Sequence, residues 1–351
     1  MRLGLLGWPG AGKTTLFNAL TGQRQATGTF SSATHTAVVP VPDARIDRLS
    51  AVFEPRKTTY AEITFVDAAG ERDPDAEGPG FPENLLEAVR DVDALVLVVR
   101  AFEDPRVPRA PGSTTPAADL DSIEQELILR DLDRVERRLE RLHKEGHKPE
   151  TAGERAALEK ARDALHAERP LRQAEWSAEE LSRLRGFQLL SLKPALVVLN
   201  VGEEDLSAAR PAGIEPGPNR PVLQLSAQIE LELSELPAAE QREFLAQLGL
   251  EQPVRERFVR AAFALLDLIA FFTVGEDEVR AWSVRRGATA PVAAGRIHTD
   301  LQKGFIRAAV IHYDEFMRVG SLAGARTAGL LRLEGKQYSV CDGDIMHVRH
   351  A

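Results

Sequence analysis

This chain has only one cysteine, no long apolar run and no excess of basic charge. Its single cysteine, Cys341, permits no disulfide framework, so we expect a reducing, cytoplasmic setting. No apolar run reaches the ~18 residues that a membrane-spanning helix needs, and the first residues lack the layout of a signal peptide. With 44 Lys and Arg against 53 Asp and Glu, the net charge of −9 argues against nucleic-acid binding by overall charge. Any such binding needs a local basic surface.

The first informative pattern is a glycine-rich stretch near the N-terminus. Residues 7–14 read Gly-Trp-Pro-Gly-Ala-Gly-Lys-Thr, which fits G-x-x-x-x-G-K-[ST]. The stretch follows an apolar run at 3–6 and precedes a helix-like segment at 15–20, the context expected of a phosphate-binding loop rather than of an ordinary turn. Residues expected around the nucleotide phosphates are Pro9, Gly10, Ala11, Gly12, Lys13, Thr14 and Thr15.

Each part of this pattern has a chemical role. Glycines let backbone N–H groups converge on an anion, and the N-terminus of a helix adds partial positive charge. Lys13 can reach the β- and γ-phosphates, which makes it a candidate catalytic residue, and the Thr14 hydroxyl can ligate Mg²⁺.

Four further apolar runs, at 63–66, 94–99, 195–199 and 222–225, predict buried parallel strands. Together with residues 3–6 they indicate an α/β nucleotide-binding domain. The 351-residue length suggests two or three domains.

A charged helical segment separates the third and fourth of these five runs. Apolar residues recur at three- and four-residue spacing from Leu120 to Leu142, residues 146–149 interrupt the pattern, and a second run leads to Pro170. We expect an antiparallel helical hairpin, or coiled-coil insertion, at 119–190, which serves either as a spacer or as a partner-binding arm.

The remaining boundaries follow from this insertion. The nucleotide-binding domain is expected at 1–118 and 191–268, with a helix at 254–269. A small α+β domain, rich in glycine, is expected at 269–351.

Three later positions complete a nucleotide site. Asp67 ends an apolar run and begins Asp-Ala-Ala-Gly, a D-x-x-G pattern in which Asp67 would hold Mg²⁺ and the amide of Gly70 would sense the γ-phosphate. Asn200 and Ser226 follow the last two runs, where GTPases carry N-K-x-D and S-A-K; alternatively, both only cap strand ends. Base-contacting candidates are Asn200, Val201, Glu203, Ser226, Ala227 and Gln228.

The base-recognition pattern departs from that of a GTPase. The aspartate that pairs with guanine N1–H and its 2-amino group is replaced by Glu203, and the lysine by Val201. Since a site built for one base edge can reject another base by up to ~10⁴-fold, this change argues against strict guanine selection.

The chain resembles the YchF/Obg-like ATPase family of translation-factor NTPases over essentially its whole length. The resemblance rests on the phosphate loop and on residues 39–43, 67–70, 100–104, 200–203, 271–273, 277–282, 293–300 and 303–306. It implies a C-terminal TGS domain of β-grasp fold, a preference for ATP over GTP, slow Mg²⁺-dependent hydrolysis and association with the ribosome through large-subunit RNA. A monomer is expected.

A local basic stretch agrees with an RNA partner. Residues 280–299 contain no acidic side chain, although a solvated loop surface is the alternative. The candidate RNA contacts are Arg280, Arg285, Arg286, Arg296 and His298.

Three departures from the family bear on catalysis. Gly10 stands where an asparagine that helps to place a monovalent cation is usual, which leaves K⁺ stimulation open. Glu71 follows the D-x-x-G pattern in place of Leu or Gln, and its carboxylate adds like charge near a γ-phosphate. The switch that follows is replaced by residues 72–77, and the switch I hydroxyl falls at Ser31 or Thr34.

The leading hypothesis is a P-loop ATPase whose nucleotide state gates binding to the ribosome. A GTPase of the same class and a non-hydrolysing, nucleotide-dependent binding module are the alternatives.

Overall fold

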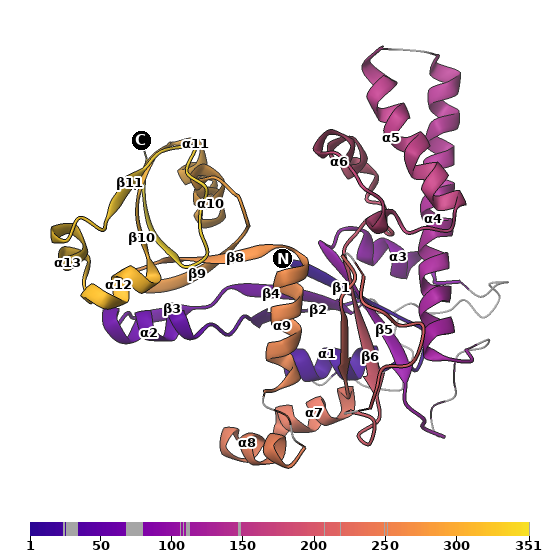
Figure 1. Ribbon diagram of the computed structural model, residues 1–351, viewed down its shortest axis with the longest axis horizontal. Coiled ribbons are helices and arrows are strands. Elements are labelled where there is room, and N and C mark those ends of the chain that lie inside the picture. Colours follow the sequence, from indigo (N-terminus) through magenta and orange to yellow (C-terminus); the bar gives the residue numbers. More distant parts are fainter. Residues whose placement is uncertain are drawn as a thin grey trace. The chain divides into compact units, whose positions relative to one another are not determined.

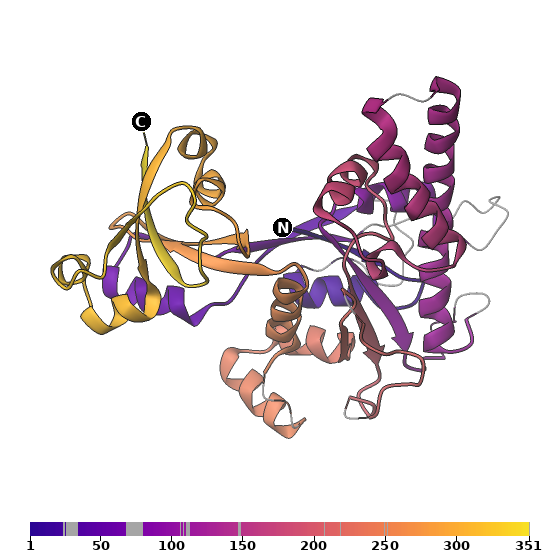
Figure 2. The same ribbon diagram turned by 45° about the horizontal axis from the view of Figure 1, so that its top comes forward.

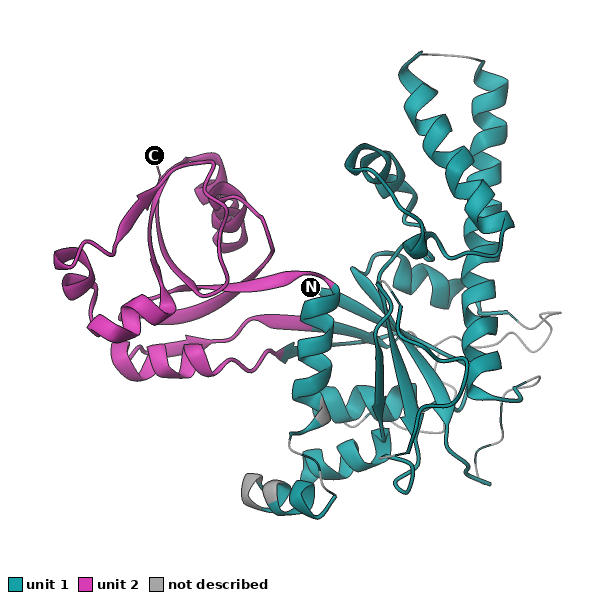
Figure 3. Ribbon diagram, in the orientation of Figure 1, with its two compact units in different colours: residues 1–39, 64–265 teal, residues 40–63, 266–351 magenta. Residues whose placement is uncertain are grey.

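The structure is a computed structural model. It describes residues 1–23, 25, 34–67, 80–105, 107, 109, 113–146, 149–206, 208–217, 219–248, 250 and 252–350. The chain divides into two compact units, residues 1–39 with 64–265 and residues 40–63 with 266–351 (Figure 3). Among the helices of these described ranges, none combines the length and the apolar character that a bilayer span requires.

A six-stranded sheet, ordered β2-β4-β1-β5-β6-β7, forms the centre of the first unit (Figure 1). The five predicted strands are confirmed and run parallel to one another. The strands are β1 (Arg2–Leu6), β2 (His35–Pro40), β4 (Glu62–Asp67), β5 (Ala94–Ala101), β6 (Ala195–Val201) and β7 (Val222–Leu225).

Helices cover both faces of this sheet, as its doubly apolar strands require. α3 (Glu83–Arg90) and the first turns of α4 (Pro116–Glu145) share a core with β1, β5 and β6. On the opposite face, Phe258 of α9 (Val254–Leu265) lies 5.5 Å from Phe65 of β4, between ring centroids. α1 (Lys13–Thr21) packs against α7 (Ala227–Glu235), which α8 (Ala238–Gln247) follows.

The predicted helix at 254–269 is too long. α9 ends at Leu265, and residues from Leu268 already form strand β8. Asp267 between them takes a positive φ of 47°, a conformation that interrupts the helix.

The predicted helical hairpin is confirmed. α4 and α5 (Pro149–His166) run side by side in both views (Figures 1 and 2), and a shorter α6 (Ala178–Leu184) follows. Val135 and Leu142 of α4 meet Leu158 and Leu165 of α5 in a core separate from that of the sheet. Gly146, with φ of 81°, ends α4 where the sequence predicts a break.

A buried carboxylate joins the hairpin to the sheet. Asp131 of α4 accepts hydrogen bonds from the backbone N–H groups of Leu190 (2.8 Å) and Ser191 (2.7 Å) and from the Ser191 hydroxyl (2.6 Å). Burial raises the pKa of Asp131, and these donors oppose that shift. The chain returning to β6 is thereby held on α4.

The second unit contains another six-stranded sheet, ordered β11-β10-β12-β8-β9-β3. Its α+β character confirms the predicted class. The strands are β3 (Lys57–Thr59), β8 (Leu268–Thr273), β9 (Glu278–Arg285), β10 (Phe305–His312), β11 (Arg332–Glu334) and β12 (Asp344–His350). The helices are α2 (Ala44–Phe53), α10 (Ala290–Ile297), α11 (Thr299–Lys303), α12 (Tyr313–Val319) and α13 (Leu322–Thr327).

Residues 40–63 belong to this second unit, whereas the sequence-based boundaries place them in the nucleotide-binding domain. β3 pairs in parallel with β9, and Thr59 Oγ1 donates to Glu278 Oε1 at 2.6 Å. Phe53 of α2 stacks on Phe316 of α12 with ring centroids 5.3 Å apart. Short polar segments such as β3 carry little periodicity, so their long-range partner is not visible in the sequence.

We expect Phe53→Ala to destabilise the second unit by about 2 kcal/mol, because it removes an aromatic contact and leaves a partly filled space against Phe316. Hydrogen–deuterium exchange of the full chain should show faster exchange in residues 268–350. Val52→Ala is the matched control, since Val52 is 41% exposed. Unchanged exchange in the Phe53 variant would contradict the assignment of 40–63 to this unit.

Candidate nucleotide-binding site

The phosphate loop connects β1 to α1, and two of its glycines are required by close packing. A Cβ on Gly7 would lie 2.3 Å from the carbonyl oxygen of Val98, and one on Gly12 would lie 2.2 Å from Asn200 Nδ2. Gly12 also has φ of 91°, in the left-handed region. No side chain larger than hydrogen fits at either position without displacing the loop.

The N-terminus of α1 offers free backbone donors. Its N-cap is Gly12, which supplies no side-chain acceptor, and its first turn contains no acidic residue. By contrast, Asp43 caps α2 and Thr115 caps α4 through side-chain oxygens. Uncapped first-turn amides with a helix dipole behind them form an anion site.

Lys13 and Asp67 face each other beside this helix end. The Lys13 ammonium donates to the carbonyl oxygens of Gly7 (2.9 Å) and Trp8 (3.2 Å). Burial lowers the pKa of Lys13, while the Asp67 carboxylate opposes the shift. Burial likewise raises the pKa of Asp67, and the charge of Lys13 and a hydrogen bond from the Thr14 hydroxyl oppose it. Asp67 is only 3% exposed.

The oxygens of Thr14 and Asp67 are the candidate protein ligands for a magnesium ion. The Thr14 hydroxyl and the Asp67 carboxylate are within hydrogen-bond reach of each other. The described part of the chain contains no group of three or more His, Cys, Asp or Glu residues that could hold a metal. Mg²⁺ commonly takes one or two protein oxygens and completes its shell with phosphates and water, so this pair fits that ion.

Asn200 joins the phosphate loop to the predicted base site. Its Nδ2 donates to the carbonyl oxygen of Ala11 at 2.9 Å, and its Oδ1 accepts from the backbone N–H of Ala227, also at 2.9 Å. The side chain is 4% exposed. The structure thus brings together three of the predicted nucleotide-site segments through one buried amide.

The other predicted base-site residues divide into buried and exposed ones. Val201, Ser226 and Ala227 are buried. Glu203 and Gln228 are exposed, and Gln228 Nε2 donates to Glu232 Oε1 at 2.8 Å along α7. Of the phosphate-loop residues, Pro9 is exposed, whereas Gly10, Thr14 and Thr15 are half-buried.

Three predicted positions cannot be placed. Gly70, Glu71 and Ser31 lie outside the described residues, whereas Thr34 is described and exposed.

The five predicted RNA contacts do not form a single basic face. Arg285 and Arg296 are exposed. Because side chains alternate along β9, Arg285 lies on the opposite face from Trp282, which packs with α10, the helix that carries Arg296. The other three have acidic neighbours: Arg280 Nη1 lies 4.0 Å from Glu278 Oε1, Arg286 Nε 3.0 Å from Asp267 Oδ1, and His298 Nδ1 3.5 Å from Asp300 Oδ2.

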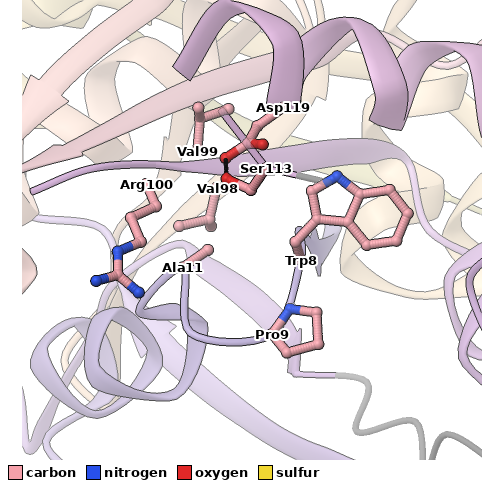
Figure 4. Close-up of a pocket in the computed structure, with 8 residues that line it drawn as sticks. All are labelled: Trp8, Pro9, Ala11, Val98, Val99, Arg100, Ser113 and Asp119. Carbon is pink, nitrogen blue, oxygen red and sulfur yellow. Dashed lines mark hydrogen bonds between the residues drawn. The ribbon is translucent and has the colours of Figure 1, made fainter. Parts of the chain in front are cut away.

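Sequence reasoning gave no individual role to Trp8 or Arg100. Both line a small pocket behind the phosphate loop, together with Pro9, Ala11, Val98, Val99, Ser113 and Asp119 (Figure 4). The buried Arg100 guanidinium donates to the carbonyls of Phe102 (3.2 Å) and Val107 (2.8 Å) and so holds the loop after β5. The sequence signal that could have identified Arg100 is its charge near the end of an apolar strand.

We expect Gly12→Ala to weaken nucleotide binding by more than about tenfold, since a Cβ there would break the Asn200 bridge and oppose the left-handed backbone. Titration with a fluorescent ATP analogue measures the effect. Gly22→Ala is the matched control: Gly22 also has a positive φ, 69°, but nothing lies within 4 Å of its added Cβ. Equal affinities of the two variants would show that the close approach to Asn200 is unimportant.

Comparisons with known proteins agree with this geometry. Residues 2–129 match a family model described as a 50S ribosome-binding GTPase (MMR_HSR1), and residues 268–351 match YchF-GTPase_C, described as a protein of unknown function (DUF933). The solved structure of the Schizosaccharomyces pombe YchF GTPase is 32% identical, with a TM-score of 0.86, and covers 99% of this chain and 97% of its own.

Curated relatives match at nearly full length. The Ribosome-binding ATPase YchF of Pasteurella multocida is 40% identical, over 99% of this chain and 98% of its own length. The protein of the same name from Bacillus subtilis is 37% identical, with the same coverage of both. Since the identity extends through the phosphate loop, the helical hairpin and the C-terminal unit alike, this chain belongs to the YchF family.

Proposed function

We propose that this protein is a ribosome-binding ATPase that uses its bound nucleotide as a switch. The observation that carries the proposal is the phosphate loop, where the uncapped amides of α1 adjoin Lys13 and Thr14, both of which interact with Asp67. Relatives that match this chain over nearly their whole length are named ribosome-binding ATPases.

In the proposed complex, the first-turn amides of α1 and Lys13 hold the β- and γ-phosphates. Thr14 and Asp67 hold Mg²⁺, which supplies charge neutralisation at the phosphates when it is bound. The role of Lys13 suits its environment: its ammonium is desolvated, so a phosphate oxygen offers it a stronger partner than the two carbonyls that it contacts.

Adenine is the proposed base. The carboxylate that would pair with guanine is displaced by one methylene at Glu203, and the buried Val201 stands where GTPases carry lysine. Asn200 bonds two backbone groups and so organises the base site, and its amide has a second N–H and a second oxygen lone pair with which to contact the base.

Slow, Mg²⁺-dependent ATP hydrolysis tests this proposal. We expect turnover by the wild-type protein with ribosomes present, its loss on chelation of Mg²⁺, and at least a tenfold loss in Lys13→Ala, because that variant removes the cation from the phosphates. Competition between ATP and GTP measures the base preference. Tighter binding of GTP than of ATP would reject the ATP preference and favour a GTPase. Wild-type turnover no faster than that of the Lys13 variant would reject hydrolysis and favour a non-hydrolysing, nucleotide-dependent binding module.

Binding to the ribosome is tested separately, by sedimentation with and without nucleotide. We propose RNA phosphate as the contact for the exposed Arg285, so Arg285→Glu should weaken binding and reduce its salt dependence by about one phosphate contact. Arg286→Glu is the informative comparison, since Arg286 already pairs with Asp267 and should matter less. A wild-type protein that never sediments with ribosomes would refute this part of the proposal.

A further inference from the structure

Trp8 connects the phosphate loop to two other elements of the first unit. Its indole Nε1 donates to the Ser122 hydroxyl on α4, with an N–O distance of 2.9 Å. Its ring stacks on Phe81, just before α3, with centroids 4.4 Å apart and planes 18° from parallel. A tryptophan held by both its polar edge and its face has little rotational freedom.

The backbone of the same residue shapes the loop. The Trp8 carbonyl oxygen accepts hydrogen bonds from the Ala11 N–H (3.2 Å) and from the Lys13 ammonium (3.2 Å). A shift of Trp8 therefore moves a carbonyl oxygen that accepts a hydrogen bond from Lys13, the residue proposed to hold the phosphates. Through this residue, the position of α4 and the shape of the loop depend on each other.

Helix α4 extends this dependence to the hairpin. Leu120 and Ile123, on either side of Ser122, lie in the core of the sheet. Val135 and Leu142, further along the same helix, lie in the core shared with α5. A 30-residue helix without a break carries both contacts, so its first turns cannot tilt independently of the hairpin.

We propose that Trp8 is a positioning residue that fixes the phosphate loop on α4, so that triphosphate binding and the state of the α4–α5 hairpin are coupled through its indole. This inference rests on the proposed function, because it takes the phosphates of ATP as the ligand of the loop. By linkage, a partner that holds the hairpin in one state changes ATP affinity by the same factor as ATP changes the affinity for that partner.

A double-mutant cycle separates this role from simple packing. Trp8→Phe keeps a ring against Phe81 and removes the N–H, and Ser122→Ala removes only the acceptor. Each should weaken binding of a fluorescent ATP analogue about threefold to tenfold, as expected for one hydrogen bond, and the double variant should be no weaker than Trp8→Phe alone. Trp282→Phe is the matched control, since its indole donates to the Thr273 hydroxyl within the second unit.

Hydrogen–deuterium exchange supplies the second readout. Without nucleotide, the amides of residues 10–13 should exchange faster in both variants than in the wild type and the Trp282 control. ATP should alter exchange in α4 and α5 of the wild type, and less so in Ser122→Ala.

Three results would each overturn the role of Trp8. The first is that Ser122→Ala has the ATP affinity and loop exchange of the wild type. The others are additive effects in the double variant, or a response of α4 and α5 to ATP that is undiminished in Ser122→Ala. If the wild-type protein binds no triphosphate, the proposed function fails, and the exchange of the nucleotide-free loop alone decides whether Trp8 positions it.

Discussion

The candidate nucleotide site depends on the two hydrogen bonds of the Asn200 amide. One holds the carbonyl of Ala11 in the phosphate loop and the other holds the N–H of Ala227 at the start of α7. Because Asn200 is buried, losing either bond would leave an unpaired polar group inside the protein, at a cost of about 1–3 kcal/mol. The glycine at position 12 follows from this arrangement, since the amide occupies the space that a Cβ would need. One buried side chain thus holds the phosphate loop and the proposed base site together.

Much of the fold could be predicted because the responsible signals are local. The apolar runs that became β1, β5 and β6 are buried on both faces, which makes them visible without any knowledge of their partners. The runs in β4 and β7 include half-buried positions but are still mostly apolar. β2 was missed because its residues alternate between buried and exposed, and its sequence carries a proline at the end. The overlong helix at 254–269 failed for the opposite reason: the apolar residues of α9 and β8 adjoin, and a short apolar run does not distinguish a helix from a strand.

The site was predictable to the extent that its chemistry lies in contiguous residues. The phosphate loop, Asp67 and Asn200 were identified from patterns, and the structure brings the loop, Thr14, Asp67 and Asn200 together. Contacts between residues far apart in the sequence could not be predicted from any local pattern. Trp8 occupies a variable position of its motif, and its hydrogen-bond partner Ser122 is 114 residues away. The predicted RNA contacts at 280–299 stay a prediction, but closeness in sequence does not place strand and helix residues on one surface.

The position of residues 40–63 has a consequence for synthesis of the chain. Thr59 and its partner Glu278 are 219 residues apart, so α2 and β3 leave the translating ribosome long before their sheet exists. Until β9 and α12 emerge, the ring of Phe53 and the edge of β3 have no native partner. Contacts of such separation form slowly and leave apolar surface open to misassociation. The amino-terminal half of this protein therefore cannot complete its folding before its carboxyl-terminal residues have been made.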